Sequence, residues 1–155
     1  MYSSEEVIAL AVNVETNGER FYNESARKAE GDLKKIFEFL AEQEDLHRLR
    51  FESLRKYATD FIIPRDWEEV EPYLNAIVES TFFMGNEKSF KRAMGAKDSV
   101  EALEFALQFE KDTLLFFNEI VDFSREQNKK IINEIIKEEK KHIEMISKLL
   151  RERRV

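Results

Sequence analysis

Long stretches of the chain repeat apolar residues at helix spacing, and this periodicity restricts the folds open to it. In IINEIIKEEKKHIEMISKLL (131–150), apolar residues recur every three or four positions, as on one helix face. Similar patterns predict helices over about 4–30, 32–57 and 98–125, and this run predicts a fourth over about 128–152. Gly (4) and Pro (2) are too scarce for the many turns of an all-β fold. The sequence therefore predicts an all-α fold.

Local sequence signals indicate where these helices begin and end. The Ser-x-x-Glu sequence at 3–6 and the Asp-x-x-Glu sequence at 98–101 predict capping boxes at the first and third helices. We expect Gly31 to end the first helix, Asp32 to cap the second, and Asn128 or a neighbour to start the fourth. Both helix pairs then have short turns, which makes the two helices of each pair antiparallel neighbours.

Residues 59–97 separate the two helix pairs and have a less regular pattern. Within them, EVEPYLNAIVES (69–80) and EKSFKRAM (87–94) predict two short helices. Two helix pairs joined by a connection of this length describe a ferritin-like four-helix bundle with one long, partly helical crossover. We expect residues 1–155 to form a single domain.

Polar residues interrupt the predicted core face of each long helix. The first and third helices each place one Glu there, and the second and fourth each place a Glu-x-x-His pair, which lies on one side of a helix. The chain has only two histidines, and both belong to these pairs. The halves resemble each other at an offset of 95 residues, with the same spacing between the two glutamates of each half. The six residues are Glu15, Glu44, His47, Glu110, Glu139 and His142.

The positions of these residues relative to the predicted turns bring the four carboxylates to one level. A helix rises 1.5 Å per residue, so the two glutamates of each antiparallel pair meet near mid-height. Four buried carboxylates gathered at one level beside two imidazoles repel one another strongly unless cations neutralise them. Two divalent or trivalent ions achieve this, so we predict a metal site. The alternative is that all six residues are solvated surface groups.

The segments around these residues also resemble a known family. ETNGERFY (15–22), EDLH (44–47), EKDTLLFF (110–117) and EKKH (139–142) resemble the ferritin-like diiron-carboxylate proteins, specifically the rubrerythrin branch, over nearly the whole chain. The resemblance implies two iron ions, with manganese as the alternative metal. It implies that all six residues are metal ligands, with Glu44 and Glu139 bridging the ions.

Other positions carry further implications of this resemblance. Tyr22 matches a family tyrosine near the metals and is expected to hydrogen-bond a ligand carboxylate; the alternative is a core tyrosine that only packs its ring. Thr113 stands where rubrerythrins proper carry another Glu, and the chain lacks the Cys-rich rubredoxin segment. Gly18 and Thr113 are small and leave room either for an oxidant or for close helix packing.

These observations leave several functions open. The first is a diiron oxidoreductase that reacts with O2 or hydrogen peroxide, or oxidises Fe(II), in oxidative-stress defence or iron handling. Because Thr113 replaces the additional Glu of rubrerythrins proper, we expect O2 rather than peroxide to be the preferred oxidant. An iron-storage or ferroxidase shell protein, a diiron hydroxylase and a non-enzymatic helical module with structural metals are the alternatives. We expect an electron-donor protein in trans and a homodimer or larger homo-oligomer.

Charge and composition exclude other classes of function. The net charge of −7 argues against a nucleic-acid partner. The absence of cysteine excludes disulfides, Cys-ligated zinc and iron–sulfur clusters within this chain. No run approaches 18 apolar residues, so no membrane partner is expected, and the first residues do not resemble a signal peptide. The expected location is the cytoplasm.

Overall fold

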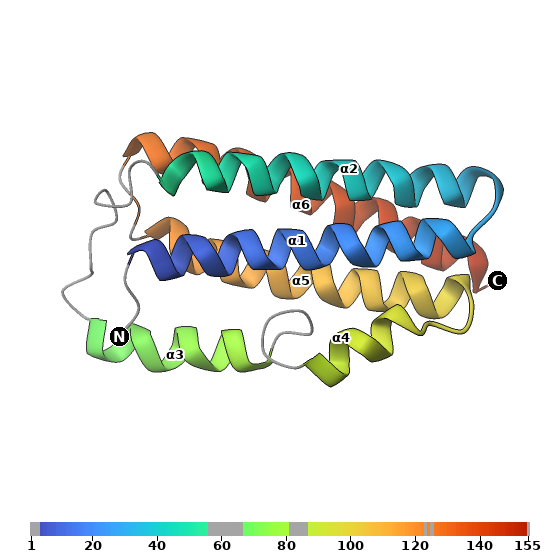
Figure 1. Ribbon diagram of the computed structural model, residues 1–155, viewed down its shortest axis with the longest axis horizontal. Helices are drawn as coiled ribbons and strands as arrows, with labels where there is room; N and C mark the ends of the chain where they lie inside the picture. The colour runs from blue at the N-terminus through green and yellow to red at the C-terminus, as the bar shows by residue number, and fades with distance from the viewer. Residues whose placement is uncertain (1–3, 56–66, 81–86, 123, 125, 155) are drawn as a thin grey trace.

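Four long helices lie side by side in the computed structural model, which describes residues 4–55, 67–80, 87–122, 124 and 126–154 (Figure 1). They are α1 (Ser4–Lys28), α2 (Gly31–Leu54), α5 (Ser99–Asp122) and α6 (Glu126–Arg153). α1 packs against α2 and α5 against α6, and the pairs meet through α1 with α5 and α2 with α6. The predicted all-α four-helix bundle is confirmed.

The crossover contains both of the short helices expected from the sequence. α3 (Trp67–Ser80) and α4 (Glu87–Met94) lie along one side of the bundle, where α3 contacts α5 and α4 contacts α1. Their buried side chains join the apolar core of the bundle; Leu74 and Ala93 are almost completely buried. The crossover runs the length of the bundle, so α5 starts at the end where α1 finishes (Figure 1). No described helix is long and apolar enough to cross a membrane.

The helix ends agree only in part with the expected signals. The capping box before α5 is formed in part: Asp98 Oδ1 accepts a bond from the N–H of Glu101 at 2.9 Å, whereas Glu101 Oε2 accepts one at 2.6 Å from the N–H of Lys97, the residue before the cap. Asp32, however, does not cap α2, which begins one residue earlier at Gly31; Asp32 lies in its first turn. Ser3, expected to cap the first helix, lies outside the described residues.

The fourth helix starts earlier than expected. α6 begins at Glu126, so Asn128 lies inside the helix rather than at its start, and it is buried. The expected start at Asn128 or a neighbour followed from residue type, because Asn is a preferred N-cap, and helix starts read from sequence commonly differ by one or two residues. The shift of two residues leaves the rest of the helix in phase with the predicted core face.

Gly31 makes the turn between α1 and α2 tight. Its φ is +63°, the left-handed region that side chains with a Cβ adopt only with strain. A Cβ at this position would meet no atom within 4 Å, so the effect of a substitution comes from backbone strain and not from steric contact.

We predict that Gly31→Ala lowers the free energy of unfolding by about 1 kcal/mol. Urea unfolding followed by circular dichroism measures the change. Gly95→Ala is the matched control: its new Cβ has ordinary contacts of 3.6 Å with the carbonyl oxygens of Lys91 and Arg92, so it should cause little loss. Equal losses in both variants would contradict the role given to the backbone at Gly31.

Candidate metal centre

Each of the four long helices delivers its polar core residues to one level of the bundle. Glu15 comes from α1, Glu44 and His47 from α2, Glu110 from α5, and Glu139 with His142 from α6. All six side chains are buried, and none is more than 3% exposed. The apolar stripes on either side of these residues hold each helix in the rotation that turns them inward. The structure therefore brings together every residue singled out in the sequence.

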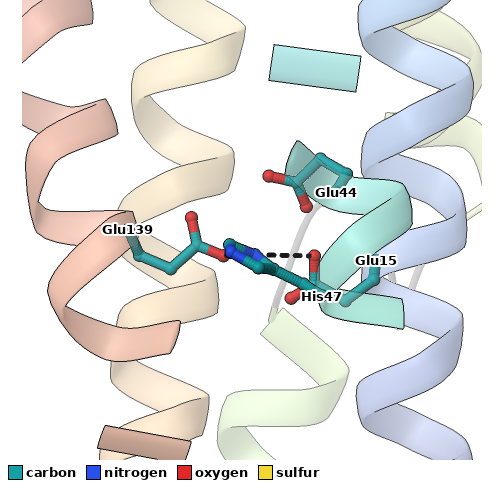
Figure 2. Close-up of side chains that lie close together, drawn as sticks. All are labelled: Glu15, Glu44, His47 and Glu139. Atoms are coloured by element: carbon teal, nitrogen blue, oxygen red, sulfur yellow. Dashed lines mark hydrogen bonds and ion pairs between the residues drawn. The ribbon is translucent and has the colours of Figure 1, made fainter. Parts of the chain in front are cut away.

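The six residues form two overlapping groups, each with ligand atoms within 4.8 Å of one another. One group is Glu15, Glu44, His47 and Glu139, whose side chains point toward one another in Figure 2. The other is Glu44, Glu110, Glu139 and His142. Glu44 and Glu139 belong to both, so the geometry gives these two carboxylates the shared positions between two candidate ions.

Both histidines turn the same ring nitrogen toward the carboxylates. His47 Nδ1 lies 3.0 Å from Glu139 Oε1 and 3.6 Å from Glu15 Oε2. His142 Nδ1 lies 3.0 Å from Glu139 Oε2 and 3.5 Å from Glu110 Oε1. The two imidazole rings stack with their centroids 5.9 Å apart. Each half of the bundle thus offers one imidazole nitrogen to the cluster.

The carboxylates have too few hydrogen-bond donors for their number. Both oxygens of Glu15, both of Glu44 and Oε2 of Glu110 are buried with no hydrogen-bond partner among the described residues. Leaving buried polar groups unpaired costs about 1–3 kcal/mol each, and more for charged groups. Five unpaired carboxylate oxygens around two imidazole nitrogens form a donor set that suits iron or manganese. The residues present fit a two-metal centre.

The protonation of the metal-free cluster reflects the same crowding. Burial and neighbouring carboxylates raise the pKa of Glu15 and Glu44 well above the ordinary range. Burial and the charge of Glu139 raise the pKa of Glu110 to about 8. Burial also acts to raise the pKa of Glu139, but hydrogen bonds from Glu110, His142 and His47 outweigh it and lower that pKa.

Both histidines hold their protons more tightly than usual. Burial alone lowers an imidazole pKa, but the bonds and charges of the carboxylates outweigh it here. They raise the pKa of His47 to about 9, chiefly through Glu139, and that of His142 to about 10, through Glu110 and Glu139. Metal ions would compete with these protons for the same atoms, so metal binding would release protons near neutral pH.

Tyr22 donates a hydrogen bond directly to the cluster. Its hydroxyl lies 2.5 Å from Glu110 Oε1, and the side chain is completely buried beside Phe37 and Phe109. Burial, followed by the charge of Glu110, raises the pKa of Tyr22, which keeps the phenol neutral and able to donate. The bond agrees with the expected role of Tyr22 beside a candidate ligand.

Gly18 is small because its neighbours occupy the adjacent space. A Cβ there would lie 2.5 Å from Cζ of Phe109 and 2.9 Å from Glu44 Oε2. Of the two interpretations of Gly18, close helix packing is therefore the one the geometry favours. Thr113 is also buried, and its hydroxyl has no hydrogen-bond partner among the residues that the structure describes.

Sequence reasoning missed a chain of charged residues behind His47. Its Nε2 lies 2.5 Å from Glu138 Oε2, Glu138 Oε2 lies 3.4 Å from Arg50 Nη1, and Arg50 Nη2 lies 2.6 Å from Glu134 Oε2. The available signal was the Glu immediately before the EKKH segment, which replaces Gln43 of the first half. A carboxylate bonded to the outer nitrogen of a histidine orients the ring and strengthens it as a ligand.

The fold and this cluster define a ferritin-like diiron-carboxylate class of protein. The rubrerythrin family profile matches residues 6–95, more than half of the chain, so the chain belongs to the rubrerythrin family. A crystal structure of a protein from Thermotoga maritima, described as ferritin-like diiron-carboxylate, shares the fold with a TM-score of 0.72. It is 24% identical and covers 97% of this chain and 96% of its own. No curated protein matches the chain.

We predict that the metal-free protein becomes less stable as the pH rises from about 5.5 to about 8.5. The folded pKa of Glu110, about 8, exceeds its ordinary value of 4.5, and those of His47 and His142 exceed 6.5. The folded state therefore binds more protons than the unfolded state across this range, so the free energy of unfolding falls with rising pH. The stabilisation from the lowered pKa of Glu139 is already complete above its ordinary 4.5.

Urea unfolding with a chelator present measures this dependence. The expected loss is at least about 1 kcal/mol. Glu110→Gln cannot ionise at this position, and its stability should vary less over the same range. A free energy of unfolding that rises with pH in the wild type would contradict the protonation described here.

Proposed function

We propose that this chain is a cytoplasmic diiron-carboxylate oxidoreductase that uses O2 or hydrogen peroxide as oxidant, in oxidative-stress defence or iron handling. The observation that supports the proposal is the pair of overlapping ligand groups that share Glu44 and Glu139. Two redox-active ions held by these residues would supply the electrons that reduce a small oxidant. We assign iron to both positions, with manganese as the alternative.

The residues of the chain have distinct tasks in this proposal. Glu44 and Glu139 would bind both ions, because they belong to both ligand groups, while Glu15 and Glu110 would each bind one. The apolar side chains packed around the cluster exclude water and increase the strength of every charge interaction inside it. Tyr22 holds Glu110 in place and keeps a proton next to the cluster.

The reaction also requires a source of electrons. The sequence has no cysteine and thus no rubredoxin-type or iron–sulfur centre of its own. We therefore propose a separate electron-donor protein as partner. Fe(II) itself is the alternative donor, in which case the activity is that of a ferroxidase.

The first prediction of this proposal concerns metal content and stability together. We expect about two transition-metal ions per chain after anaerobic reconstitution with Fe(II). Glu44→Gln should bind markedly less metal, because a shared ligand serves both positions. The same variant should unfold at an equal or higher temperature without metal, because it removes a buried carboxylate that lacks a hydrogen-bond partner.

Elemental analysis and metal-free melting curves test both effects. Glu42→Ala, an exposed substitution on the same helix, should keep the wild-type metal content. Unchanged metal content in Glu44→Gln would contradict the ligand assignment.

The second prediction concerns the oxidant. Thr113 provides a neutral hydroxyl where rubrerythrins proper have a carboxylate, so we expect the reduced, iron-loaded protein to react with O2 at least as fast as with hydrogen peroxide. Stopped-flow absorbance after anaerobic mixing with each oxidant measures the two rates. Thr113→Val is the control and should keep the ratio of rates, while Thr113→Glu should shift it toward peroxide. A wild-type peroxide rate that exceeds the O2 rate by orders of magnitude would refute the assignment.

A further inference from the structure

The two halves of the centre differ in the residues that surround the candidate ligands. At the offset of 95 residues, Tyr22 corresponds to Phe117 and Gln43 corresponds to Glu138. Both contacts cross between halves: Tyr22 of the first half bonds Glu110 of the second, and Glu138 of the second bonds His47 of the first. Each of these two contacts is therefore made by one half of the centre, because the corresponding residue of the other half is of a different type.

The outer edges of the two histidines show this difference most clearly. His47 Nε2 bonds Glu138, whose carboxylate is also 3.4 Å from Arg50. His142 has no bond to Nε2 among the described residues; besides its Nδ1 contacts, its ring stacks on His47 and meets Phe39 edge-on. A carboxylate on the outer nitrogen fixes the orientation and the tautomer of the ring, which strengthens it as a ligand, and only His47 has this contact among the described residues.

The outer carboxylates differ in the same direction. Both oxygens of Glu15 are free of hydrogen bonds from the described residues, whereas Oε1 of Glu110 accepts the bond from Tyr22. Glu15 therefore offers two unengaged oxygens and Glu110 offers one. The position with the stronger imidazole is also the position with more free oxygen donors.

We propose that the two metal positions are unequal and fill in sequence. The Glu15–His47 position, completed by Glu44 and Glu139, takes the first divalent ion, and the Glu110–His142 position takes the second. Glu138 is the positioning residue that sets this order through His47. The inference rests on the proposed two-metal function and adds to it an order of binding.

The probe is Co(II), titrated anaerobically into metal-free protein and followed by calorimetry and visible absorption. The wild type should bind in two resolved steps. Glu138→Gln keeps a hydrogen-bond acceptor for His47 but removes the charge, so the first step should weaken by about tenfold or more. Gln43→Glu supplies the missing carboxylate to the other half, so it should tighten the second step and bring the two steps closer together.

Ligand variants identify which position fills first. Glu15→Gln should remove the tight step, whereas Glu110→Gln should keep it and weaken the second step. Glu144→Gln, an exposed substitution on α6, should leave both steps unchanged. This control, together with the opposite effects of Glu138→Gln and Gln43→Glu, separates an electrostatic effect on the ligand from a general loss of structure.

The outcomes distinguish this inference from the proposed function. Two steps with the first weakened in Glu138→Gln support the order. Two ions bound with equal affinity, with no effect of Glu138→Gln, would overturn the order and leave the two-metal proposal intact. No binding of Co(II) to the wild type would overturn both.

Discussion

The mutual repulsion of four buried carboxylates is the constraint on which the rest of this structure depends. Glu15, Glu44, Glu110 and Glu139 lie at one level of an apolar core, and their donors among the described residues are two imidazoles and one phenol. The pKa shifts show that the metal-free protein accommodates them by retaining protons. The apolar core above and below this level stabilises the fold against the repulsion. Cations bound at the same level would replace these protons and turn the repulsion into attraction.

The topology of the bundle explains why two carboxylates are shared. α2 and α6 carry the two Glu-x-x-His pairs and lie in contact, while α1 and α5 contribute single glutamates from the other side. Glu44 and Glu139 therefore face each other across the centre, with Glu15 and Glu110 at its ends. A repeated sequence thus produces an approximately twofold arrangement of ligands. The differences between the halves, such as Glu138 in place of Gln43, lie just outside that arrangement.

Much of this arrangement was predictable because it depends on quantities that a sequence carries directly. Helix periodicity predicts which face of each helix points inward. The rise per residue and the equal spacing of Glu15–Glu44 and Glu110–Glu139 predict that the candidate ligands lie at one level along the bundle. The contact from Glu138 to His47 was missed because it depends on how two distant helices are rotated against each other. The Arg50–Glu134 ion pair was missed because a chain with 25 basic and 32 acidic residues offers many equivalent pairings. The wrong expectation for Asp32 came from relying on residue type, whereas the positive φ of Gly31 decides where that helix begins.

The surroundings of the centre differ between its α1 side and its α2–α6 side. On the α1 side, Phe109 and Glu44 already fill the space beside Gly18. On the α2–α6 side, Glu138 bonds His47 while its own side chain remains 37% exposed. The exposed side chains of Leu46 and Leu49 line a surface pocket with Glu138. One carboxylate therefore connects a buried candidate ligand to solvent. In the proposed order of metal binding, Glu138 acts through His47, so changes at this surface would reach the proposed metal position through a single hydrogen bond.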